Sequence, residues 1–177
     1  MSLFPVFQWL QNTEFATALR ESGLPYPIVM TCHLTGMALF GGMILMTDLR
    51  LLGLAMKDYS VTDVVKQLRI WKRIGFVIVV TCGVLLAWCE AEKYYGNPFF
   101  WTKMTLLSLV GVHALIFRGS VYNNTEEIDR APKIPTKAKV AACLSLLLWS
   151  GLVCAGRWIG YYESPRTQGA VSQVVSK

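Results

Sequence analysis

The chain has 177 residues, of which 54% are hydrophobic and 16% are charged, and its mean hydropathy is +0.43. A soluble domain of this length normally carries more charge and less apolar sequence, so a soluble single domain is not expected. The 17 Lys and Arg residues exceed the 11 Asp and Glu residues, which gives a net charge of +6. This excess does not by itself indicate nucleic-acid binding, because membrane proteins concentrate basic residues in the loops on one side.

Four apolar blocks follow one another along the chain and are separated by charged connectors. At about 1.5 Å per residue, each block is long enough to cross a hydrocarbon core of about 30 Å as a helix. All seven prolines lie outside the blocks, where a residue that removes a helix hydrogen bond is harmless. The sequence predicts one all-α membrane domain, a four-helix up-down-up-down bundle with spans over 28–52, 74–92, 99–117 and 140–161.

Two further segments are predicted as short interfacial helices on the membrane surface. In residues 60–73 the apolar side chains follow helical spacing, and Ser60 with Asp63 is placed like a helix cap. The other side of this helix is basic and consists of Lys66, Arg69, Lys72 and Arg73. The apolar N-terminal stretch, from Phe4 to Leu19, is expected to lie on the opposite membrane surface in the same way.

The basic residues predict the orientation of the spans. Eleven of the 17 fall in the two long connectors or at the helix ends beside them. These are Arg50, Lys57, Lys66, Arg69, Lys72, Arg73, Arg118, Arg130, Lys133, Lys137 and Lys139. Because basic loops stay in the cytoplasm, the two connectors are expected there and both termini on the opposite side.

The two histidines, His33 and His113, both fall inside predicted spans. A histidine pair on two helices of a bundle is the usual way to hold a b-type haem, and His33 alone would suit a haem or pigment with one protein ligand. Counted from the outer helix ends, His33 lies at a depth of about 9 Å and His113 at about 21 Å. A single haem between them would require a shift of about two helical turns.

Both histidines also have a structural interpretation. His113 lies at the level of Gly41 and Gly42 on the first span, where the absent side chains leave room for an imidazole. His33 would bond a nearby threonine or a backbone carbonyl. The sequence leaves the cofactor and the packing interpretations open.

The five cysteines lie in or at the ends of spans, without a C-x-x-C pair or the spacing of a zinc or iron–sulfur site. They are predicted to be small packing residues: Cys32, Cys82, Cys89, Cys143 and Cys154. No metal site is expected from this pattern.

Four charged residues stand near the predicted membrane boundaries: Asp48, Arg50, Lys103 and Arg157. Charges near the interface are far cheaper than charges at the bilayer centre, so these residues are expected to act as boundary anchors. Arg50 is expected to contact lipid phosphate. Asp48 is expected to pair with Arg118 or Lys139 at the same membrane face.

Several short motifs carry a family resemblance. They are Tyr26-Pro27-Ile28, His33-Leu34-x-Gly36, Asp48-Leu49-Arg50-Leu51-Leu52-Gly53, Asn97-Pro98-Phe99-Phe100-Trp101-x-Lys103 and Gly156-Arg157-Trp158-Ile159-x-Tyr161. With them the chain resembles, over nearly its whole length, an uncharacterised family of small bacterial four-helix inner-membrane proteins. The resemblance implies the fold, a bacterial origin and a multi-pass inner-membrane location, which makes the predicted side of both termini periplasmic. It implies no activity.

Two functional hypotheses follow. An enzyme is not expected, because the sequence shows no nucleophile with its base, no phosphate-binding glycine loop and no metal triad. The first hypothesis is a non-catalytic accessory subunit of a respiratory or photosynthetic membrane complex, with the polar tail 168–177 contacting partner subunits. The second is a small electron carrier that binds haem b through His33 with or without His113. The sequence does not identify the cofactor, and a bound pigment or lipid is the other candidate. Membrane lipids and other membrane subunits are the expected partners, and nucleic acid is not.

Overall fold

The computed structural model describes residues 3–162. Within this range the chain is all-helical, with no strand, and four helices are long and apolar enough to cross a membrane. These are α3 (Pro25–Leu52), α4 (Val61–Cys89), α6 (Pro98–Phe117) and α8 (Thr136–Ile159). The shorter elements are α1 (Phe4–Gln11), α2 (Glu14–Arg20), α5 (Ala91–Tyr95), the π-helical turn η1 (Arg118–Tyr122) and α7 (Thr125–Arg130). The tail 168–177, which was predicted to contact partners, lies outside the described residues.

The ends of the long helices follow from the local sequence. α3 begins at Pro25, whose missing N–H is not needed in a first turn, and is followed by Gly53 at a left-handed φ of 74°. Ser60 accepts a hydrogen bond from the N–H of Asp63 and caps α4, as predicted. Asn97 caps α6 by accepting hydrogen bonds from two N–H groups of its first turn. Each cap satisfies backbone groups that the helix itself leaves unpaired.

The segment 60–73 is not a separate surface helix. Residues Val61–Cys89 form one uninterrupted helix, α4, so the predicted surface segment is continuous with the second span. The two parts join because no helix-breaking residue separates them and because one inward stripe runs through both. At spacings of three and four residues this stripe comprises Val61, Val65, Leu68, Lys72, Gly75 and Val79.

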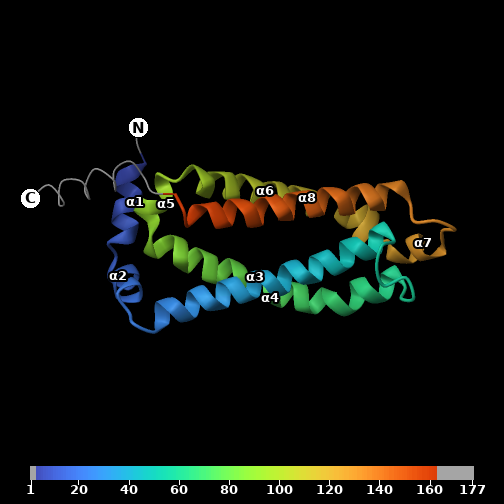
Figure 1. Cartoon of the computed structure of the whole chain (residues 1–177), viewed down its shortest axis with the longest axis horizontal. Helices are drawn as coiled ribbons and strands as arrows, with labels where there is room; N and C mark the ends of the chain where they lie inside the picture. Colours follow the sequence, from blue (N-terminus) through green and yellow to red (C-terminus); the bar gives the residue numbers. More distant parts are fainter. Residues whose placement is uncertain (1–2, 163–177) are drawn as a thin grey trace, which may run out of the picture.

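The four long helices lie side by side along the long axis of the molecule (Figure 1). α3 packs against both α4 and α8, and α8 also packs against α6. Across the described part of the chain, α4 and α6 have no comparable packing against each other. The helix contacts therefore form an open series, α4–α3–α8–α6, in which two hairpins are joined through α3 and α8.

The most densely buried part of the bundle lies at the end occupied by α7 and η1 (Figure 1). A cluster of buried side chains joins α3, α4, η1, α7 and α8 there: Leu51, Val61, Val65, Val121, Ile128, Ala138, Ala141 and Ala142. The alanines of α8 are almost completely buried, which allows the neighbouring helices to approach closely. Apolar packing thus holds this end together.

The opposite end is covered by α1 and α2, which run across the ends of the long helices (Figure 1). The indole N–H of Trp88 donates to the carbonyl of Leu10 at 2.9 Å, and the Arg20 guanidinium donates to the carbonyl of Cys89 at 3.1 Å. The N-terminal stretch therefore forms two short helices that are bonded to α4. Hydrogen bonds to backbone carbonyls and aromatic contacts, such as Phe15 against Trp88 with ring centroids 5.5 Å apart, hold this end together.

Candidate functional site

His33 lies on α3 and is fixed against α4. Its Nδ1 is 3.0 Å from the carbonyl oxygen of Val79. Because a carbonyl only accepts, Nδ1 carries the proton and donates it there. Gly83 lies against the ring, since a Cβ at this position would stand 3.0 Å from His33 Cε1. Nε2 has no hydrogen-bond partner among the described residues, so the ring is held at one nitrogen and free at the other.

Lys103 of α6 lies in the same half of the bundle as His33. It is half-buried, and a Cβ on Gly156 of α8 would lie 3.8 Å from its Nζ. Its charge acts on the His33 imidazole electrostatically. Lys103 therefore lies on the side of α6 that packs against α8.

His113 is buried at the α6–α8 contact. Its exposed fraction is 6%, and Nε2 lies 2.9 Å from the carbonyl oxygen of Ala141, to which it donates. A Cβ on Gly41 or Gly42 would meet nothing within 4 Å. The predicted packing of His113 against these two glycines is therefore wrong, because α6 packs against α8 and not against that part of α3.

The structure does not bring the two histidines together. The His113 ring lies 6.5 Å from that of Tyr122, which is at the level of Asp48. Asp48 follows His33 on α3 at a distance of about 22 Å along the helix axis. No single haem is held by both histidines in this arrangement.

A second polar cluster surrounds Asp48 near the α7 end of the bundle. Asp48 is only 1% exposed, and its Oδ2 has no hydrogen-bond partner. Ser145 of α8 lies close to both Asp48 and Tyr122. The Lys72 ammonium of α4 donates to Thr47 Oγ1 at 3.1 Å and faces the carboxylate without a direct ion pair. Side chains from α3, α4, η1 and α8 thus meet around one buried carboxylate.

This placement corrects the expectation for Asp48. The carboxylate pairs with neither Arg118 nor Lys139, because its side of α3 faces the interior of the bundle. The sequence prediction assigned Lys72 to the basic outer side of a surface helix. It therefore missed that Lys72 faces Asp48 inside the bundle. The signal was present in the sequence, since Lys72 occupies the position that continues the stripe of Val61, Val65 and Leu68.

The two remaining boundary charges have contacts within the chain. Arg50 Nε donates to the carbonyl of Tyr59 at 2.7 Å, so it closes the connector between α3 and α4. Arg157 is exposed near the end of α8, where its guanidinium donates to the hydroxyl of Tyr161 and lies 4.8 Å from the centre of that ring. The expected contact of Arg50 with lipid phosphate stays a prediction.

The cysteines have no arrangement typical of a metal centre. All five are free thiols. Across residues 3–162 there is no group of three or more His, Cys, Asp or Glu side chains placed to hold a metal ion.

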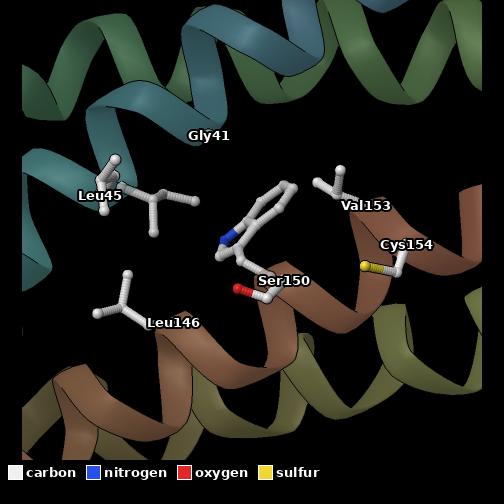
Figure 2. A pocket seen from close by; sticks show the side chains of 8 residues that line it. Gly41, Leu45, Leu146, Ser150, Val153 and Cys154 are labelled. Atoms are coloured by element: carbon white, nitrogen blue, oxygen red, sulfur yellow. The ribbon is translucent and has the colours of Figure 1, made fainter. Parts of the chain in front are cut away.

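A cleft of about 380 Å³ lies between α3 and α8. Gly41 and Leu45 line it from α3, and Leu146, Ser150 and Val153 line it from α8 (Figure 2). Leu45, Ser150 and Val153 are exposed, so the cleft opens on the side of the bundle. It is predominantly apolar and was not predicted from the sequence, because it depends on how far α3 and α8 stand apart.

Comparison with known proteins adds one finding. Residues 7–162 match the model of a protein family that is described as a family of unknown function, DUF6644. No curated protein and no solved structure shows a significant match to the chain.

Proposed function

We propose that this chain, which belongs to the family of unknown function DUF6644, is a non-catalytic membrane subunit of a larger bacterial respiratory or photosynthetic complex. Its four long apolar helices suit a multi-pass membrane protein. In this proposal they cross the bacterial inner membrane and bury part of their outer surface against partner subunits.

The orientation in the membrane is part of the proposal and rests on the basic residues. Most of them lie in the connectors between α3 and α4 and between α6 and α8, or on the adjoining parts of the long helices, toward the α7 end of the molecule (Figure 1). Positive loops favour the cytoplasm, which gives an up-down-up-down bundle with both termini in the periplasm. Alkaline phosphatase fused after residue 162 should then be active, and phosphatase inserted in the 131–135 connector should be inactive. The reverse pattern would contradict this orientation.

The observation that carries the subunit proposal is the uncovered apolar surface of α4 and α6. Each of these helices packs extensively against only one other long helix. On α6 the exposed fractions of Leu115 and Ile116 are 71% and 64%, and on α4 those of Val77 and Val84 are 60% and 56%. Lipid tails are as apolar as these side chains, so close packing against another protein helix would add specific contacts that lipid does not give.

Photo-cross-linking in cells tests the proposal. A benzophenone amino acid in place of Leu115 on α6 or Val84 on α4 should give a discrete protein adduct. Mass spectrometry should identify the adduct as a subunit of one redox complex. The matched control is Leu39, a 65% exposed leucine on α3, which has long-helix neighbours on two sides. If positions 84 and 115 react only with lipid, the chain has no partner there and the proposal is wrong.

A second function, binding of one haem b by His33, is favoured by the geometry of that side chain. Metal-ligating histidines commonly donate their other ring N–H to a carbonyl, which fixes the tautomer and aims the free nitrogen. His33 has this arrangement, with Nδ1–H bound to Val79 O and Nε2 without a partner in residues 3–162. A haem held there would supply electron transfer, and the chain would supply His33 Nε2 as a ligand together with the Val79 carbonyl that orients the ring.

A reduced-minus-oxidised spectrum of the detergent-purified chain tests this second function. A haem held by His33 should give an α-band that His33→Ala abolishes. His113→Ala should leave the band unchanged, because His113 Nε2 is engaged by Ala141. A featureless wild-type spectrum, or a band that survives His33→Ala, would exclude His33 as the ligand.

A further inference from the structure

The cleft between α3 and α8 lies in the middle of both helices. Gly41 is about 24 Å from the start of α3 and about 16 Å from its end, and Ser150 is about 21 Å and 14 Å from the ends of α8. Its volume of about 380 Å³ falls within the range of small-molecule pockets. A Cβ on Gly41 would meet nothing within 4 Å, so the cleft floor is open at this glycine.

Two hydrogen-bond donors line this apolar space without a partner. Neither the indole N–H of Trp149 nor the hydroxyl of Ser150 has a hydrogen bond within the described part of the chain. Several other helical hydroxyls are satisfied locally, as when Thr47 and Ser108 donate to carbonyls four residues earlier, although Thr62 Oγ1 on α4 also has no partner. Figure 2 shows the Ser150 hydroxyl in the space between α8 and the α3 residues Gly41 and Leu45.

Unpaired donors in an apolar environment are costly, and at mid-membrane depth water is scarce. A ligand that satisfies both must be lipid-soluble and must offer an acceptor oxygen in the middle of the bilayer. Phospholipid ester carbonyls belong to the interfacial region. The ring of an isoprenoid quinone has carbonyl acceptors and a flat apolar face that suits the indole of Trp149.

We propose that the α3–α8 cleft binds the head of an isoprenoid quinone, with a ring carbonyl accepting hydrogen bonds from Trp149 Nε1 and Ser150 Oγ. Gly41 leaves room for the ring, and the isoprenoid tail leaves through the open side of the cleft into the lipid. This site concerns the chain alone and does not depend on partner subunits or on haem.

Equilibrium binding of decylubiquinone to the detergent-purified chain tests the proposal. Ultrafiltration and ultraviolet absorbance should show saturable binding of one quinone per chain. Gly41→Leu should weaken binding at least tenfold by filling the cleft. The matched control is Gly42→Leu, which also meets open space but does not line the cleft, and should bind as the wild type does.

Donor variants give a second readout that does not depend on filling the cleft. Trp149→Phe keeps an aromatic ring and Ser150→Ala keeps the helix, so both should fold, and each should weaken quinone binding about threefold to tenfold through a lost hydrogen bond. Decylbenzene has a similar tail and no carbonyl, so its binding should not respond to either donor variant.

Three results would overturn the quinone site. Binding that does not saturate would show partition into the detergent only. Equal affinity in the wild type and Gly41→Leu would place the quinone elsewhere. Quinone binding that ignores both donor substitutions, as decylbenzene does, would identify a general site for alkyl chains.

Discussion

At the residue scale, the imidazole of His33 depends on a missing side chain. Gly83 gives the ring room to reach Val79, because a methyl group there would stand 3.0 Å from Cε1. We therefore expect Gly83→Ala to displace the ring and to cost about 1 kcal/mol for the weakened hydrogen bond, measured by unfolding in mixed micelles.

The matched control for this substitution is Gly111→Ala on α6, whose Cβ would meet nothing within 4 Å. This control measures how much the free energy of unfolding rises when alanine replaces glycine within a helix, which is about 0.5–1 kcal/mol. Equal stabilisation by both substitutions would show that the ring position is not constrained by Gly83.

The buried Asp48 carboxylate gives a second prediction at this scale. Asp48→Asn leaves the Lys72 ammonium without a counter-charge and should destabilise the bundle. We expect less than the roughly 3–5 kcal/mol typical of a fully buried pair, since Lys72 is only half-buried. The measurement is the free energy of unfolding by sodium dodecyl sulfate.

The double variant Asp48→Asn with Lys72→Met separates charge from packing. Removing both charges should restore part of the stability lost in the single variant, because the stranded ammonium is gone. Strictly additive losses would mean that the two groups do not interact.

Sequence reasoning recognised these side chains but assigned several of them to the wrong neighbours. His33 and His113 were singled out because an ionisable group inside a span is rare, and both bond backbone carbonyls of adjacent helices. The partner helix of each depends on the packing order of the bundle, which hydropathy does not encode. Asp48 was assigned to the membrane boundary because it lies near the end of the first span. It is buried because it lies on the side of α3 that faces the other helices.

At the element scale, α7 caps the start of α4. Asp129 accepts hydrogen bonds from the backbone N–H groups of Val61 and Thr62 at 2.7 and 2.9 Å. Burial alone would raise the pKa of Asp129, but the adjacent Thr62, the two backbone N–H donors and the nearby Arg50 guanidinium hold the pKa below its ordinary value. The negative charge of Asp129 also interacts favourably with the positive end of the α4 helix dipole.

This cap predicts a pH dependence. Because the pKa of Asp129 is lower in the folded chain than in the unfolded chain, its contribution is present above the unfolded value of about 4 and is lost as the pH falls through the folded value. The thermal midpoint of Asp129→Asn should be lower than that of the wild type at pH 6, and the difference should shrink toward pH 3.

Glu126→Gln is the control, because the Glu126–Lys66 pair is more than half exposed and should contribute little. A difference between Asp129→Asn and the wild type that stays constant from pH 6 to pH 3 would contradict the capping role of the charge.

The existence of the four long helices was predictable from the sequence. The point at which the second long helix begins was not. Hydropathy and the proline positions located every block, whereas the boundary between surface helix and span within Val61–Cys89 does not exist. The basic residues at 66, 69, 72 and 73 suggested an interface, but helix continuity is set by backbone propensity and by the stripe that packs on α3. Charge patterning predicts where a helix meets water, and it does not show where a helix ends.

At the scale of the whole molecule, stability is concentrated where α8 contributes alanines to the buried cluster. Ala142→Leu should overpack this cluster and cost about 1–3 kcal/mol in the free energy of unfolding. Ala114→Leu makes the same change on an exposed position of α6 and should alter stability by less than about 0.5 kcal/mol. Similar losses for the two variants would show that the cluster is loosely packed.

The open series of helices gives the molecule two free edges. Where a closed square of four helices would join α4 to α6, the described residues leave that side without extensive contact. A fifth helix laid between α4 and α6 would close the series into a ring without breaking any contact that the chain already makes. In this sense the bundle resembles a sheet with an unpaired edge strand, and the vacant side is where growth into a larger assembly requires the least rearrangement.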